Sequence, residues 1–176
     1  MAVRAISLDR PLPPTAAGLD DVEMGPRANL VTGAVVGYVA SRVMDVATSA
    51  YYARQSEESR QREVEIAPHG TLVDLGQMLG GAVGRDLPPE QAGKVGLMAH
   101  RTLGVTYGVI ASVLVNRGMA PVLAGGTVGL AAWVVVDEGL SLPTFSQYKP
   151  ESHIRGLIGH STWGLTAGLL LSLTSR

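Results

Sequence analysis

The chain of 176 residues is 46% apolar and only 16% charged, with 22 glycines, no cysteine and a net charge of −1. Disordered chains combine low hydrophobicity with high net charge, so this composition excludes a largely disordered protein. Without cysteine there is no disulfide, thiolate metal site or cysteine nucleophile. The near-zero net charge gives no reason to expect a nucleic-acid partner. Because only 5% of residues are aromatic, the apolar content is small and aliphatic, which is typical of packed membrane helices.

The first 28 residues form a polar segment that four prolines interrupt: Pro11, Pro13, Pro14 and Pro26. It lacks the continuous apolar region of a secretory signal. We therefore expect residues 1–28 to be a mostly irregular N-terminal tail and residues 29–176 to form the main domain.

A long apolar segment covers residues 29–50, close to the roughly 20 residues that cross a hydrocarbon core. The pattern predicts that this helix continues through the charged residues 51–66. Residues 71–84 are apolar but too few to span a bilayer, which favours an interfacial or re-entrant helix. The segment 51–90 is thus predicted to be a charged helical insertion.

Three more apolar segments follow, within a helix over 89–116, over 119–136 and over 154–174. A soluble four-helix bundle would need a polar face on each helix, and the last two segments have none. The sequence predicts an all-α integral membrane bundle of four transmembrane helices with one extra interfacial helix. A soluble helical protein is the alternative.

The two halves of the chain resemble each other in the same order. Residues 33–45 match 125–137 at six of thirteen positions, and residues 99–114 match 159–174 at six of sixteen. We interpret this as a duplicated two-helix unit. Copies with two spans each share one topology, which predicts a pseudo-twofold axis along the membrane normal.

Each predicted span contains two glycines four residues apart. Such pairs let helix backbones approach closely in lipid, where van der Waals contact replaces the hydrophobic effect. We predict that these glycines pack helices together, within the bundle or between copies in a homo-oligomer. The residues are Gly33, Gly37, Gly104, Gly108, Gly125, Gly129, Gly164 and Gly168.

The predicted topology brings the ionisable residues near the span ends to one side of the membrane. They are Arg42, Asp45, His100, Arg101, Asp137, Glu138 and His160. One interpretation is a polar site of two related pairs, Asp45 with His100 and Asp137 with His160, that relays protons or binds a cation. The other is a set of interface anchors and helix-end ion pairs with snorkelling arginines. The spacing matches no known metal-ligand, cofactor or hydrolase motif, so we expect no metal, cofactor or catalytic residue.

Outside the spans, the insertion side carries seven Lys or Arg residues and the other side five, a small excess that favours a cytoplasmic insertion. Three stretches carry a family resemblance: GAVVGYVASRVMDV, AHRTLGVTYGVIASVL and HIRGLIGHSTWGLTAGLLL. They resemble the YagU-like group of small bacterial inner-membrane proteins of unknown function. The resemblance implies a multi-span protein of the bacterial inner (cytoplasmic) membrane with a link to acid tolerance, and no catalytic residues.

Two functions follow as hypotheses. The first is a small non-enzymatic membrane protein that supports proton, ion or solute handling through the one-sided Asp and His residues. The second is a structural membrane anchor that docks a partner such as a redox enzyme, through glycine-faced helices and the polar tail. An enzyme acting on lipids would be a third, but no motif supports it.

Overall fold

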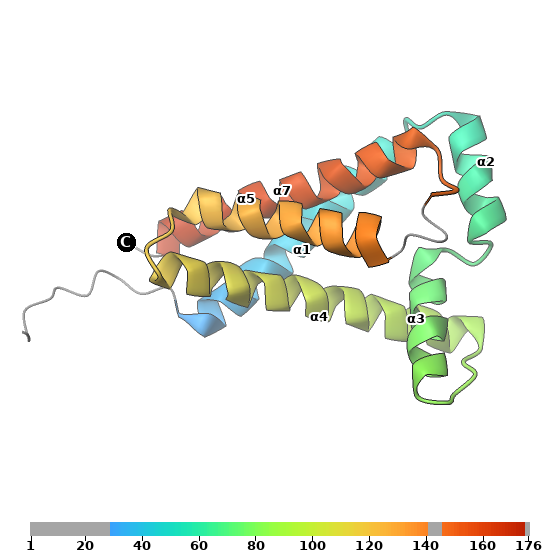
Figure 1. Ribbon diagram of the computed structural model, residues 1–176, viewed down its shortest axis with the longest axis horizontal. Coiled ribbons are helices and arrows are strands. Elements are labelled where there is room, and N and C mark those ends of the chain that lie inside the picture. Colours follow the sequence, from blue (N-terminus) through green and yellow to red (C-terminus); the bar gives the residue numbers. More distant parts are fainter. Residues whose placement is uncertain (1–28, 141–145, 175–176) are drawn as a thin grey trace, which may run out of the picture.

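The computed structural model describes residues 29–140 and 146–174, and all regular structure among them is helical. The predicted polar tail, residues 1–28, lies outside the described residues. The long helices lie side by side in one elongated bundle (Figure 1). They are α1 (Leu30–Tyr52), α4 (Pro89–Asn116), α5 (Pro121–Ala132) with its continuation η1 (Trp133–Leu140), and α7 (Pro150–Thr174).

The surface of the bundle is apolar and its interior is made of small residues. Fully buried positions include Ala40, Ala111 and Ala124, whereas Val46 and Met98 are about 70% exposed. A protein in water would bury such large side chains and place polar ones outside. Large apolar residues outside and small residues inside suit a helix bundle in lipid. Lipid tails solvate leucine and valine, and small residues let helix backbones come into contact.

Three of the described helices are long and apolar enough to cross a membrane: Leu30–Tyr52, Pro89–Asn116 and Pro121–Gly139. Helix α7 has 25 residues but is not among the three. Its middle carries His160 and the hydroxyls of Ser161 and Thr162, which lower its apolar character. The fourth span therefore stays a prediction.

The expected continuous helix through residues 51–66 is wrong. Helix α1 ends at Tyr52, and α2 (Glu57–Ile66) begins after a short turn. Ser56 caps α2 by accepting a hydrogen bond from the backbone N–H of Ser59. This cap favours the start of a new helix over the continuation of α1. Helix α3 (Thr71–Ala82) follows, and Figure 1 shows α2 and α3 together at one end of the bundle.

The third apolar segment differs from the expected α-helix over 119–136. It is α-helical only to Ala132 and then continues as a π-helix from Trp133 to Leu140. A π-helix holds more residues per turn than an α-helix, and such turns are frequent at functional sites. The widened turns include Asp137, so its side chain leaves the helix in a different direction from the one that 3.6 periodicity predicts.

The glycines lie where the helices come closest. A Cβ atom on Gly37 would collide with the carbonyl oxygen of Gly104, and one on Gly108 would meet the backbone of Gly33 and Gly37. Helices α1 and α4 thus touch backbone to backbone.

The other pair of helices, α5 and α7, meets in the same manner. Cβ atoms on Gly125 and Gly129 would collide with the backbone carbonyls of Gly164 and His160. The contacts are displaced by one helical turn relative to the first pair: Gly37 faces Gly104, whereas the aligned Gly129 faces His160. Both halves therefore use glycine contacts but in different registers.

Candidate functional site

Four titratable residues lie at one level of the bundle. Asp45, His100, Asp137 and His160 are each about 21 to 24 Å from the opposite end of their helix, at about 1.5 Å per residue. This level lies nearer the end of the bundle that carries α2 and α3, and the distance is shorter than the roughly 30 Å of a hydrocarbon core. Ionisable groups at such depth are costly and are expected to pair.

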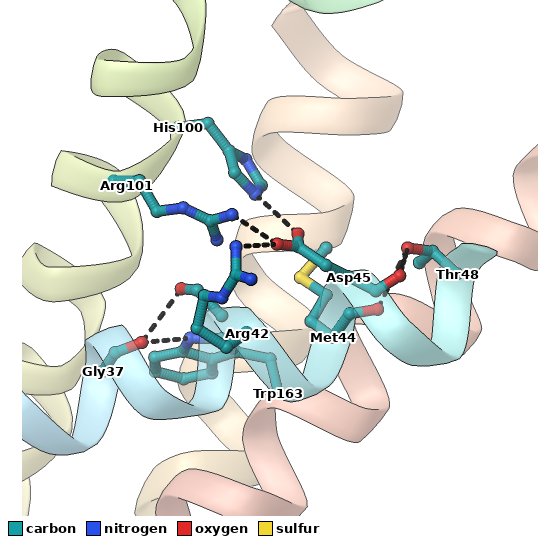
Figure 2. Close-up of polar contacts among 9 residues, drawn as sticks. Gly37, Arg42, Met44, Asp45, Thr48, His100, Arg101 and Trp163 are labelled. Atoms are coloured by element: carbon teal, nitrogen blue, oxygen red, sulfur yellow. Dashed lines mark hydrogen bonds and ion pairs between the residues drawn. The ribbon is translucent and has the colours of Figure 1, made fainter. Parts of the chain in front are cut away.

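The first cluster joins α1 to α4. His100 Nε2 lies 3.4 Å from Asp45 Oδ1, and the Arg101 guanidinium contacts Asp45 Oδ2. Arg42 Nη1 is 3.6 Å from the same carboxylate oxygen. In Figure 2 both guanidinium groups converge on Asp45, with His100 on its other oxygen. One carboxylate therefore faces two permanent positive charges and one titratable imidazole.

The second cluster joins η1 to α7. His160 Nε2 lies 3.3 Å from Asp137 Oδ2, and only 10% of the His160 side chain is exposed. The neighbouring Glu138 does not join this pair, because its carboxylate contacts His153 Nδ1 at 3.0 Å. The described residues thus place the predicted polar residues in three groups.

A cavity of about 90 Å³ lies between the two clusters, at the meeting point of all four long helices. His100, His160 and Asp137 line it, together with apolar and aromatic side chains. At about 30 Å³ per water in the liquid, the volume is enough for roughly three waters, and three titratable groups supply polar partners for them. The remaining lining residues are Ser41, Met44, Leu103, Gly104, Tyr107, Val136 and Trp163.

Hydrogen bonds to a helix carbonyl position the wall of this cavity. Gly37 O accepts from Ser41 Oγ at 2.9 Å and from Trp163 Nε1 at 3.3 Å, as Figure 2 shows for the tryptophan. The Tyr107 ring meets Trp163 edge to face, with centroids 5.9 Å apart. Trp163 is thereby held by α1 and α4, and its rigid ring closes one side of the cavity.

A buried polar network fixes the end of α7 outside the apolar bundle. Glu63 Oε2 is 2.9 Å from the Arg155 guanidinium, and Ser152 Oγ donates to Glu63 Oε1 at 2.6 Å. Gln55 Oε1 accepts from Arg155, and its amide donates to Glu63. These contacts tie the turn after α1 and helix α2 to the start of α7, and so hold the polar level of the bundle in place.

The ionisable groups with shifted pKa values in this outer region include Glu58 and Tyr148. The pKa of Glu58 is lowered by its hydrogen bond and charge interaction with Lys149. Burial raises the pKa of Tyr148, and the charges of Asp74 and Glu63 add to the effect.

The sequence identified the Asp and His residues but missed the groups that shape the cavity. Ser41, Tyr107 and Trp163 carry no motif. A signal existed for two of them: Ser41 lies four residues after Gly37, and Tyr107 three after Gly104, so both lie near the glycine contact. The π-helix that carries Asp137 has no sequence signature of comparable clarity.

Known proteins add no further assignment. No family model, curated protein or solved structure matches the chain. The YagU-like resemblance therefore stays a prediction. Within the described residues, no three His, Cys, Asp or Glu side chains gather closely enough to hold a metal ion.

Proposed function

We propose that the chain is a small, non-enzymatic integral membrane protein whose four-helix bundle binds and releases protons at an internal site, and so supports proton or small-cation handling. The observation that carries the proposal is the cavity at the meeting point of the four helices, lined by His100, His160 and Asp137. Histidine as a residue type changes charge near neutral pH, and each imidazole here lies within 3.4 Å of a carboxylate oxygen.

The proposal includes α7 as a fourth span and the two halves as copies of one unit. Support comes from the equivalent placement of Asp45–His100 and Asp137–His160, each joining the last part of one helix to the next helix. The one titratable residue in the middle of α7 faces the interior, since His160 is buried and lines the cavity. A helix with its polar side turned inward can cross a bilayer although its average composition is less apolar.

The location we propose is the bacterial inner membrane, in keeping with the YagU-like resemblance. A role in acid tolerance fits an internal site that takes up protons as the pH falls. The proposal gives the paired imidazoles the central part, because histidine is the residue type best suited to exchange protons in the physiological range.

The anchor hypothesis finds less support. It relied on glycine faces to hold a partner, but Gly33, Gly37, Gly125 and Gly129 are all covered by neighbouring helices of the same chain. The polar tail that it also invoked lies outside the described residues. A partner would have to bind other surfaces.

The test is proton flux in proteoliposomes with an entrapped pH-sensitive dye. Protein with His100→Gln and His160→Gln together is compared with unmodified protein after an external acid pulse. We expect the double variant to lose most of the protein-dependent flux, because glutamine keeps polarity but does not titrate.

His69→Gln is the matched control, since His69 is exposed in the turn before α3 and far from the bundle interior in sequence and structure. Equal flux in the double variant and the unmodified protein would contradict the proposal. So would an equal loss in the His69 variant, because the effect would then not belong to the cavity.

A further inference from the structure

The two Asp–His pairs differ in the arginines beside them. In the aligned segments, Arg42 corresponds to Val134 and Arg101 to Ser161. The second pair therefore forms without any arginine, and its ion-pair distance of 3.3 Å is close to the 3.4 Å of the first. Arginines are not needed to join an aspartate to a histidine at this level.

The arginines leave the first cluster with excess positive charge. Two guanidinium groups face one carboxylate, and Asp45 is their only ion-pair partner among the described residues. Arg101 is also incompletely satisfied, because its Nη1 is buried and has no hydrogen-bond partner within the described part of the chain. Surplus cationic charge at membrane depth is costly, which favours an anion nearby.

Arg42 is placed to reach such an anion. Its side chain is 60% exposed and lies on the outer face of α1 among exposed apolar residues. Val39 and Val46, one turn to either side, are 40% and 71% exposed. A guanidinium on a lipid-facing surface extends toward the headgroup layer, where the available anions are phosphates.

We propose that Arg42, next to the positive charge of Arg101, forms a binding site for a phosphate group at the α1–α4 surface, supplied by the headgroup of an anionic phospholipid. The guanidinium fork matches phosphate geometry and donates two hydrogen bonds to it. The occupant neutralises the surplus charge beside Asp45. This inference needs α1 and α4 to lie in a membrane but does not depend on proton handling by the cavity.

Native mass spectrometry of the detergent-solubilised protein, titrated with phosphatidylglycerol or phosphatidylcholine of equal chain length, tests the site. Unmodified protein should bind phosphatidylglycerol preferentially. Arg42→Val, which copies the second half, should weaken that binding about tenfold, the loss expected for a charge-assisted contact. Arg42→Lys keeps the charge without the fork and should retain part of the affinity.

Arg54→Val is the matched control, because Arg54 is exposed just beyond α1 and donates to the carbonyl of Ala50 within its own segment. Equal binding by unmodified and Arg42→Val protein would overturn the proposal, as would an equal loss in the Arg54 variant. Adding inorganic phosphate identifies the source. Displacement of the lipid at millimolar phosphate supports a site for the free anion, and no displacement supports the lipid headgroup.

The lipid-binding test and the proton-flux test can fail independently, because they use different residues. Arg42 does not line the cavity, so Arg42→Val should bind less lipid while His100 and His160 still line the cavity and the flux is retained. The double glutamine variant should show the reverse, with lipid binding retained and flux lost.

Discussion

The Asp45–His100 pair and the Asp137–His160 pair join neighbouring helices at one level of the bundle, yet their surroundings differ. The first lies between two regular α-helices and has two arginines beside it. The second lies on a π-helix, has no arginine, and its histidine is 10% exposed against 29% for His100. The comparison shows that an Asp–His contact forms both between two α-helices and between a π-helix and an α-helix. The net charge around each contact differs because only the first pair has arginines beside it.

The largest expected effect concerns the glycine contacts that bring each pair of helices together. Gly37→Ala places a Cβ against the backbone of both Gly104 and Gly108, and backbone atoms cannot move aside as a side chain end can. We expect a loss of about 2–3 kcal/mol of unfolding free energy, as for other overpacked sites. Thermal unfolding in detergent micelles measures it.

The same measurement on Gly129→Ala and Gly126→Ala sharpens the comparison. Gly129 meets backbone in the second half and should also lose stability, whereas Gly126 has open space and should be neutral or gain slightly from higher helix propensity. Equal effects at Gly126 and Gly37 would show that close helix contact is not what these glycines provide.

The next effect distinguishes the two carboxylates. Asp45→Asn leaves Arg42 and Arg101 without their ion-pair partner among the described residues, while Asp137 has no arginine beside it in the described residues. We expect Asp45→Asn to cost about 2 kcal/mol more of unfolding free energy, part of the cost of leaving a buried charge unpaired. Chemical denaturation in micelles would reveal it, and a greater loss for Asp137→Asn would reverse the comparison.

A smaller difference is expected at the two tryptophans. Trp163 Nε1 donates to Gly37 O, whereas Trp133 Nε1 is buried without a hydrogen-bond partner in the described residues. Trp163→Phe should therefore cost about 1 kcal/mol, and Trp133→Phe should be neutral or slightly stabilising because it removes an unsatisfied donor. Unfolding midpoints of the two variants, recorded under identical conditions, decide between these outcomes.

The smallest effect concerns the ion pair that links the insertion of the first half to the segment before α7. The pKa of Glu58 lies below its ordinary value because of Lys149, so the pair stabilises the fold above the unfolded-state pKa and loses that contribution as the pH falls through the folded-state pKa. Lys149→Ala should raise the pKa of Glu58 toward 4.5. A carboxyl NMR titration checks the shift, and an unchanged pKa would exclude the contact in solution.

The helices were predictable because apolar composition and glycine spacing are local properties. Gly33, Gly37, Gly104 and Gly108 recur at four-residue intervals, and the structure places them against one another. The end of α1 at Tyr52 was missed because charged residues 57–66 are good helix formers, and only the cap at Ser56 and the contacts of Gln55 and Glu63 separate the two helices.

The candidate site was predictable only in part, for a physical reason. Aspartate and histidine in apolar segments are conspicuous, since their burial is costly. The cavity depends instead on where Trp163 and Tyr107 meet after four helices pack, and the direction of the Asp137 side chain depends on a π-helix in place of an α-helix.

The common level of the four titratable residues has an electrical consequence. A site about 22 Å from one end of a core about 30 Å thick lies about a quarter of the way in from the other end. Under the proposed function, a proton that reaches it from the α2–α3 end would cross about a quarter of the membrane voltage, worth about 0.6 kcal/mol per 100 mV. The occupancy of the imidazoles would then depend on membrane potential as well as on pH, with a charge-movement signal of about a quarter of an elementary charge per proton.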